Sequence, residues 1–105
     1  MQSWTPHELA AYLLNDPQSL KLLDVREPWE YDIAHIQGAT LIPLGKLAQD
    51  INTLERNTTY VVICHHGIRS AHACYFLERN GFQTINLTGG IDRWAQDIDR
   101  DMPLY

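Results

Sequence analysis

Apolar residues along this chain form two kinds of pattern, short continuous runs and stretches with helical spacing. Continuous apolar runs are typical of strands that lie in the middle of a parallel sheet and are buried on both faces. Such runs lie at residues 20–25, 39–42, 60–63 and 84–87. We therefore predict a strand at each of these positions.

Between the runs, apolar residues recur every three or four positions, which predicts helices. The first helix is predicted to begin at Thr5, because Thr5 and Glu8 can form a capping box and Pro6 fits the first helical position. Further helical segments are predicted at residues 28–31, 44–54, 69–80 and 91–98, and the first is predicted to stop at residues 15–17. Strands that alternate with helices over short links predict a single α/β domain over residues 1–105 with a mainly parallel sheet.

One cysteine lies where a predicted strand leads into a predicted helix. Cys64 directly follows the run at residues 60–63, and a short loop separates it from the helix that begins at Arg69. Loop N–H groups and a helix N-terminus stabilise negative charge on a sulfur in this position. Gly67 supplies a tight turn and Arg69 a fixed cation, and a structural cysteine needs neither. We predict that Cys64 is reactive.

Two other loops are expected beside Cys64. Ligands of parallel α/β sheets bind beyond the carboxyl ends of the strands, and Asp24 and the pair Gly89 and Gly90 stand at such ends. Three loops should therefore converge on one pocket. Cys74, over one helical turn beyond Arg69, is predicted to be a small core residue too far from Cys64 for a disulfide.

The composition argues against several partners. The net charge is −5 and no cluster of Lys or Arg is present, which disfavours binding to nucleic acid or to an anionic membrane. Residues 1–4 have neither a cationic start nor an apolar run of the kind that signal peptides carry, and no segment approaches a membrane-spanning length. We expect a cytoplasmic protein with reduced cysteines.

Three segments resemble the signatures of the rhodanese (sulfurtransferase) family. Residues 23–31 with 35–39 are similar to its first signature, residues 64–70 to its active-site loop, and residues 89–91 with Trp94 to its closing signature. The three occur in order and at the family's spacing. The resemblance implies a rhodanese-like fold, with a central, mainly parallel sheet of about five strands flanked by helices on both faces.

The resemblance also implies sulfur transfer through a persulfide on Cys64. A donor such as thiosulfate or a persulfide carrier would leave its outer sulfur on Cys64, and a thiophilic acceptor would remove it. The partners are then a small-molecule donor and acceptor, with a protein sulfur carrier as a further candidate, and no cofactor is expected. The substrate-binding residues would be His65, His66, Gly67, Ile68, Arg69 and Ser70, and the supporting residues Asp24, Arg26, Glu30 and His35.

Two alternatives remain open. A cysteine-based phosphatase or arsenate reductase has five residues between its cysteine and its arginine, whereas only residues 65–68 separate Cys64 from Arg69. A binding or sensing module of the same fold would act without turnover and would not need the nucleophile. No metal site is predicted, because adjacent histidines in a tight loop rarely face one ion and no CxxC or HxxxH spacing accompanies them.

Three positions depart from the two-domain members of the family that use thiosulfate well. The two positions after their cysteine are cationic, and the position of Glu30 is commonly arginine; here they are His65, His66 and Glu30. Because thiosulfate is a dianion, we expect it to bind weakly near neutral pH. The preferred donor should carry less charge or arrive on a partner protein.

Overall fold

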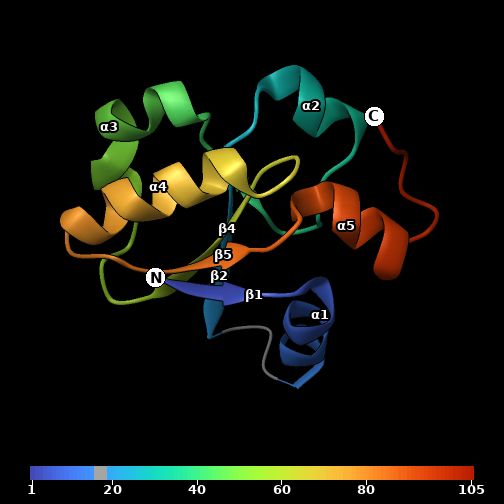
Figure 1. Ribbon diagram of the computed structural model, residues 1–105. Helices are drawn as coiled ribbons and strands as arrows, with labels where there is room; N and C mark the ends of the chain where they lie inside the picture. Colours follow the sequence, from blue (N-terminus) through green and yellow to red (C-terminus); the bar gives the residue numbers. More distant parts are fainter. Residues whose placement is uncertain (16–18) are drawn as a thin grey trace.

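Strands and helices alternate along the chain (Figure 1). The structure, a computed structural model, describes residues 1–15 and 19–105. The strands are β1 (Gln2–Trp4), β2 (Leu20–Asp24), β3 (Thr40–Leu41), β4 (Thr59–Ile63) and β5 (Gln83–Leu87). The α-helices are α1 (Pro6–Asn15), α2 (Pro28–Ile33), α3 (Leu47–Asp50), α4 (Ile68–Arg79) and α5 (Gly90–Asp97), and 3-10 turns η1 (Leu44–Lys46) and η2 (Ile51–Thr53) flank α3.

The described strands form one sheet in the order β1-β5-β4-β2-β3, and every pair of neighbours is parallel. Strand β4 is central, with Val62 paired to Leu23 of β2 on one side and to Asn86 of β5 on the other. The predicted parallel α/β sheet of about five strands is confirmed. Cys64 therefore follows the central strand, at the carboxyl edge of the sheet.

Helices cover both faces of the sheet, as predicted: α3 and α4 lie on one side and α1 on the other (Figure 1), and α5 packs with α1 in the apolar cluster of that second face. Side chains of β4 and of Cys64, which follows it, alternate between two apolar clusters: Tyr60, Val62 and Cys64 join the cluster under α4, and Val61 and Ile63 join the one under α1 and α5. The alternation follows from the two-residue period of a strand. The Cys64 side chain consequently points to the α4 side.

The structure differs from the sequence pattern at two elements. Strand β1 has no apolar run, and its three residues are strand because they pair with residues 85–87 of β5 at the edge of the sheet. The helix predicted at residues 44–54 is a single α-helical turn between two 3-10 turns. At its end, hydrogen bonds span three residues and not the four of an α-helix. The Leu54 N–H donates to Ile51 O, and the Thr53 hydroxyl donates to Asp50 O.

The first helix begins as predicted. Thr5 and Glu8 exchange hydrogen bonds, Thr5 N–H to Glu8 Oε1 at 3.0 Å and Glu8 N–H to Thr5 Oγ1 at 3.2 Å. Helix α1 ends at Asn15, and the rest of its predicted stop, Asp16 and Pro17, lies outside the described residues. Within the described part of the chain, no helix is both long and apolar enough to cross a membrane.

Candidate active site

The loop from Cys64 to Gly67 curls around the Cys64 sulfur. The Gly67 N–H lies 3.0 Å from Sγ and the Ser70 hydroxyl 3.2 Å from it, while Cys64 as a residue is only 1 % exposed. Helix α4 begins at Ile68, so its first turn stands directly against the sulfur. A backbone donor and the positive end of a helix thus surround one buried sulfur, an arrangement that suits an anion.

Two glycines let neighbouring backbones approach this loop. Gly67 has φ 100°, in the left-handed region, and a side chain there would lie 3.2 Å from Gly89 N. Gly90 packs closer still, since a Cβ at that position would press on His65 O and stand 2.5 Å from Cys64 O. The close approach allows Ile91 N–H to donate to Cys64 O at 2.8 Å and Asp92 N–H to His65 O at 3.1 Å. The start of α5 therefore fixes the first two residues of the loop.

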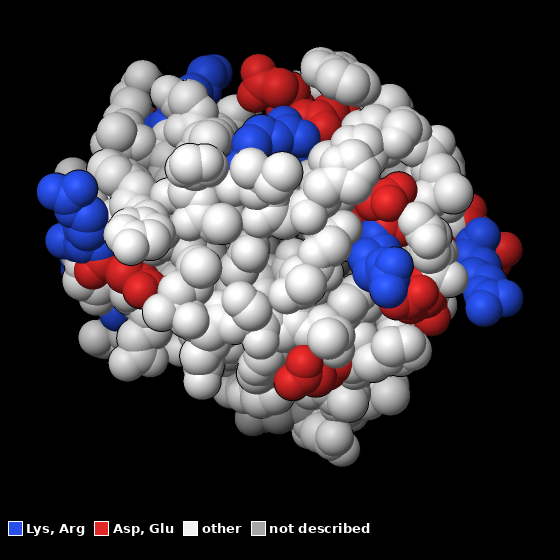
Figure 2. Space-filling model, viewed as in Figure 1, with Lys and Arg blue, Asp and Glu red and all other residues white. Residues whose placement is uncertain are grey.

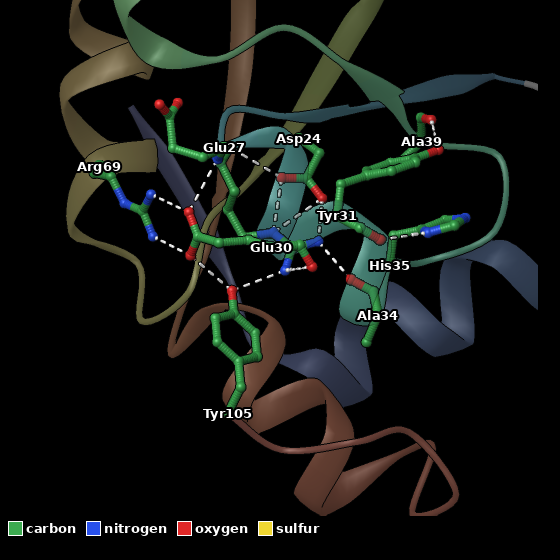
Figure 3. A network of polar contacts seen from close by, with 10 residues as sticks. Asp24, Glu27, Glu30, Tyr31, Ala34, His35, Ala39, Arg69 and Tyr105 are labelled. Carbon is green, nitrogen blue, oxygen red and sulfur yellow. Dashed lines mark hydrogen bonds and ion pairs between the residues drawn. The ribbon is translucent and has the colours of Figure 1, made fainter.

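The Arg69 side chain reaches across to α2. Its guanidinium donates to both oxygens of the Glu30 carboxylate, at 2.6 and 2.8 Å (Figure 3). Glu30 is buried and also accepts the Glu27 N–H at the start of α2. The Arg69 bonds lower the pKa of Glu30 to about 2, and the same pair raises the pKa of Arg69. Two charge-assisted hydrogen bonds between Arg69 and Glu30 thus join the N-terminal turns of α2 and α4.

Arg26 is fully buried behind this pair. Its guanidinium donates to both carboxylate oxygens of Asp24, to the carbonyls of Glu30 and Ala34, and to the Tyr105 hydroxyl. The hydrogen bonds of the Arg26 side chain run to Asp24, α2 and Tyr105, and none of them reaches the Cys64 sulfur. Asp24 and Arg26 join the end of β2 to α2, the helix that carries Glu30. Their contribution to the site is therefore to fix the position of α2.

Tyr105 was not a candidate from sequence, because residues 99–105 have no periodicity and carry no motif. Its hydroxyl donates to Glu30 Oε2 at 2.8 Å (Figure 3), and its ring stacks on His65 with centroids 4.0 Å apart. Burial raises the pKa of Tyr105 to about 12, so the hydroxyl keeps its proton near neutral pH. The last segment of the chain thus covers one side of the loop.

His65 lies between two rings, Tyr105 and His66, the latter with a centroid 3.9 Å away and an interplanar angle of 27°. Burial, with the charge of His66, lowers the pKa of His65. His66 is exposed, with Nε2 3.8 Å from Asp92 Oδ2. The three residues bring one ligand atom each within 4.8 Å of one another. However, a metal lies in the plane of an imidazole ligand, and stacked rings do not aim their lone pairs at a common point.

Two of the predicted residues lie apart from the sulfur. His35 is exposed, stacks on Tyr31 of α2 with ring centroids 3.8 Å apart and contacts the Tyr31 carbonyl, while the Tyr31 hydroxyl donates to Ala39 O before β3 (Figure 3). Ile68 opens α4 with a side chain directed to solvent. Both side chains are thus turned to solvent and not into the buried surroundings of the Cys64 sulfur.

Asn86 of β5 is a second residue that the sequence interpretation did not single out. It is a buried amide that accepts the Ser70 hydroxyl and donates to Gly67 O at 3.2 Å. A signal was present, since Asn86 is an amide inside an apolar strand run, and a buried amide needs partners. Cys74, in contrast, is a core residue as predicted; it is fully buried, its pKa is raised by burial to about 11, and both cysteines are free.

Charged side chains are scattered over the viewed side of the molecule. On the face shown in Figure 2, Lys and Arg stand singly, most of them beside an Asp or Glu, and they form no continuous basic patch.

The class of protein is defined by two features. The sheet is all-parallel with helices on both faces, and a buried cysteine lies between its central strand and the start of a helix. The family model for the rhodanese-like domain matches residues 5–97. The chain belongs to the rhodanese-like family, a family of sulfurtransferases.

Relatives agree with this assignment. The probable adenylyltransferase/sulfurtransferase MoeZ of Mycobacterium tuberculosis is 39 % identical over 104 residues, which cover 96 % of this chain and 26 % of MoeZ. The putative sulfur carrier protein YrkF of Bacillus subtilis is 40 % identical over 83 residues, 78 % of this chain and 45 % of YrkF. The chain thus spans about a quarter of the first relative and less than half of the second.

Solved structures share the fold. The rhodanese-like domain protein from Staphylococcus aureus superimposes with a TM-score of 0.85 at 34 % sequence identity, covering 90 % of this chain and 91 % of that protein.

Proposed function

We propose that this chain acts as a single rhodanese domain that transfers a sulfane sulfur through a persulfide on Cys64. The Cys64 thiolate attacks the outer sulfur of a donor such as thiosulfate or a persulfide carrier. The bond between that sulfur and the rest of the donor breaks. The rest of the donor leaves with the electron pair of that bond, which in the case of thiosulfate makes it sulfite. A thiophilic acceptor then attacks the outer sulfur, and Cys64 returns as the thiolate.

The Gly67 N–H, 3.0 Å from Sγ at the start of α4, carries this proposal. Both the attacking thiolate and the persulfide are anions, and preorganised N–H donors stabilise such charge without a separate base. The loop has only four residues between Cys64 and Arg69. It suits one additional sulfur better than a tetrahedral phosphate. The cradled nucleophile also favours transfer over a module that only binds or senses.

The charge distribution supports a donor other than free thiosulfate. Arg69, the cation closest in sequence to the loop, is committed to Glu30 by two hydrogen bonds. His65 has a lowered pKa and is neutral near pH 7. Little positive charge therefore remains to attract a dianion. We infer that the donor carries less charge or is a protein-borne persulfide, in keeping with the name of the sulfur carrier relative.

Replacement of the two cysteines tests the proposed mechanism. Cys64→Ser should abolish transfer of sulfur from thiosulfate to cyanide, because no thiolate is left to form the persulfide. Cys74→Ser should retain most of it, because Cys74 is in the core. Mass spectrometry should find one additional sulfur on the Cys74→Ser protein after incubation with donor, and none on Cys64→Ser. Turnover by Cys64→Ser would refute the mechanism.

The dependence of thiosulfate binding on pH tests the role of the histidines. Protonation of His65 or His66 adds positive charge, so the KM for thiosulfate should fall as the pH is lowered from about 7.5 to about 5.5. Since the pKa of His65 is lowered, its contribution should appear below the pH at which a free histidine titrates. His65→Ala/His66→Ala is the control for the effects of pH on cyanide and on the thiol. An identical pH dependence in that variant would show that the histidines do not bind the donor.

The proposed location is the cytoplasm, where both free cysteines would remain reduced. The proposed partners are a sulfur donor and a thiophilic acceptor, one of which can be a protein sulfur carrier.

A further inference from the structure

A chain of hydrogen bonds leads from the Cys64 sulfur to the side chain of Asn86. The Cys64 Sγ is 3.2 Å from Ser70 Oγ, and the Ser70 hydroxyl reaches Asn86 Oδ1. The other end of the Asn86 amide, Nδ2, is 3.2 Å from the Gly67 carbonyl oxygen. All three side chains are buried, with Cys64 and Ser70 exposed by 1 % or less and Asn86 by 8 %. Water therefore has little access to this chain of contacts.

The direction of each bond follows from the chemistry of the groups. The Gly67 carbonyl can only accept, so Asn86 must turn Nδ2 toward it and Oδ1 toward Ser70. Oδ1 can also only accept, so the single hydroxyl proton of Ser70 is donated to Asn86. Between Ser70 and Cys64 the proton must then come from the thiol. In this arrangement Ser70 accepts from Cys64, and the sulfur accepts from the Gly67 N–H.

A thiolate cannot keep the same arrangement. Once the thiol proton leaves for solvent, Ser70 Oγ would face the sulfur with a lone pair unless its hydroxyl turns from Asn86 Oδ1 to Sγ. The turn would give the thiolate a second donor, but it would leave Oδ1 of Asn86 buried without one. A buried acceptor without a partner is costly. Either way, an acceptor at position 86 favours the thiol over the thiolate.

We propose that Asn86 is a positioning residue that controls, through the Ser70 hydroxyl, how readily Cys64 gives up its proton. While Cys64 is a thiol, the Ser70 hydroxyl donates its hydrogen bond to Asn86 Oδ1. When the sulfur is ionised, the hydroxyl turns and donates to Sγ. When a persulfide forms, the negative charge moves to the outer sulfur, and the Ser70 hydroxyl can return to Asn86. The inference rests on the proposed role of Cys64 and adds a residue from β5, a strand that carries no part of the loop.

The proposal can be tested by the pH dependence of Cys64 alkylation with iodoacetamide. The Cys74→Ser protein is the reference, since it contains Cys64 as its single thiol. The charged or titratable groups that interact electrostatically with Cys64 include Arg69 and Cys74 of α4. Arg69 is unchanged in every variant, and Cys74 is absent from all of them. Glu30 of α2 and His65 of the loop, which lie against Arg69 and the loop, are unchanged as well.

Asn86→Leu removes the acceptor and frees the Ser70 hydroxyl to donate to the thiolate. We expect the midpoint of the alkylation profile to move down by about 0.5–1 pH units, the effect of one net hydrogen bond to sulfur. In a Ser70→Ala background the same substitution should move the midpoint by less than about 0.2 units, because no hydroxyl is left to redirect. In a Ser70→Thr background, which restores a hydroxyl, the downward shift should reappear.

The loss of the Asn86 contact to Gly67 is common to all these backgrounds and so serves as the internal control. An equal shift with and without the Ser70 hydroxyl would show that Asn86 acts only through Gly67 and would overturn the proposal. An upward shift, or none, in the Ser70 background would overturn it as well. Asn86→Ala replaces Asn86→Leu if the larger side chain prevents folding, with the same outcomes. Alkylation does not measure sulfur transfer, so failure here leaves the persulfide mechanism standing.

Discussion

At Cys64, side chains matter less than backbone groups for holding the loop in place. The Gly67 N–H faces the sulfur, and the N–H groups of Ile91 and Asp92 hold the carbonyls of Cys64 and His65. Such contacts require backbones to approach closely, which glycine permits because it has no Cβ. Gly90 is therefore the glycine at which an added methyl group should disturb the loop most.

Replacement of Gly90 by alanine tests this. Gly90 has φ 62°, and a Cβ there would collide with the backbone of Cys64 and His65. Gly38→Ala is a matched control, since Gly38 has φ 91° and a Cβ added there would meet nothing within 4 Å. Both variants carry the strain of positive φ, but Gly90→Ala should lose about 1–3 kcal/mol more stability in urea. Sulfur transfer should fall at least about tenfold in Gly90→Ala only. Equal losses would argue against the close approach as the cause.

At the level of elements, the contact between α2 and α4 sets the outer wall of the site. Both helices begin beside it, α2 at Pro28 and α4 at Ile68, and Glu30 and Arg69 join their first turns. Glu30 is buried while Arg69 is about a third exposed on its side chain. A buried carboxylate depends on its partner, so the ion pair is expected to stabilise the fold and to orient α4 toward the loop.

The contribution of the pair should depend on pH. The pKa of Glu30 is lowered from 4.5 to about 2, so its contribution is complete above about pH 4.5 and is lost as the pH falls toward 2. Glu30→Gln should reduce the free energy of unfolding at pH 7 by about 1–3 kcal/mol. The difference from wild type should shrink between pH 4.5 and pH 2 in urea titrations. Asp32→Asn, on the exposed side of the same helix, is the control and should change little. A difference that stays constant with pH would mean that ionised Glu30 is not what stabilises the contact.

At the level of the whole molecule, the end of the chain returns to the carboxyl edge of the sheet (Figure 1). Tyr105 contacts three residues that are far from it in sequence, Arg26, Glu30 and His65. One side chain therefore couples the end of β2, the start of α2 and the Cys64 loop. The hydroxyl and the ring have separate roles in this contact, which two substitutions can separate.

Tyr105→Phe should cost about 1–2 kcal/mol of stability, because Arg26 and Glu30 each lose a buried partner, while the ring keeps covering His65. Tyr105→Ala should in addition expose His65 and raise the pKa of His65 toward its ordinary value, since burial is the first cause that lowers it. NMR titration of the His65 ring protons measures this. Leu104→Ala, at an exposed neighbour, is the control. A His65 titration that is the same in wild type and Tyr105→Ala would exclude the ring as its cover.

The sequence by itself determined the features that depend on neighbours along the chain. The apolar runs specified four of the five strands of the described sheet, and the capping residues Thr5 and Glu8 specified the start of α1. The order of strand, cysteine, short loop and helix specified where Cys64 would lie. It also placed Gly67 at the turn and Cys74 in the core. Periodicity, capping and turn chemistry are local, so they can be recognised in a sequence.

Only the tertiary structure decided which distant residues meet. Strand β1 is a strand because β5 supplies its partner, and Gly90 approaches Cys64 because α5 packs beside the loop. Glu30 as the partner of Arg69, the Asn86 contact to Ser70 and the Tyr105 contact to His65 likewise join segments far apart in sequence. The stacking of His35 on Tyr31 likewise depends on how the two rings are placed in the folded chain. Contacts of this kind depend on how the elements pack, and no local pattern encodes which side chains packing brings together.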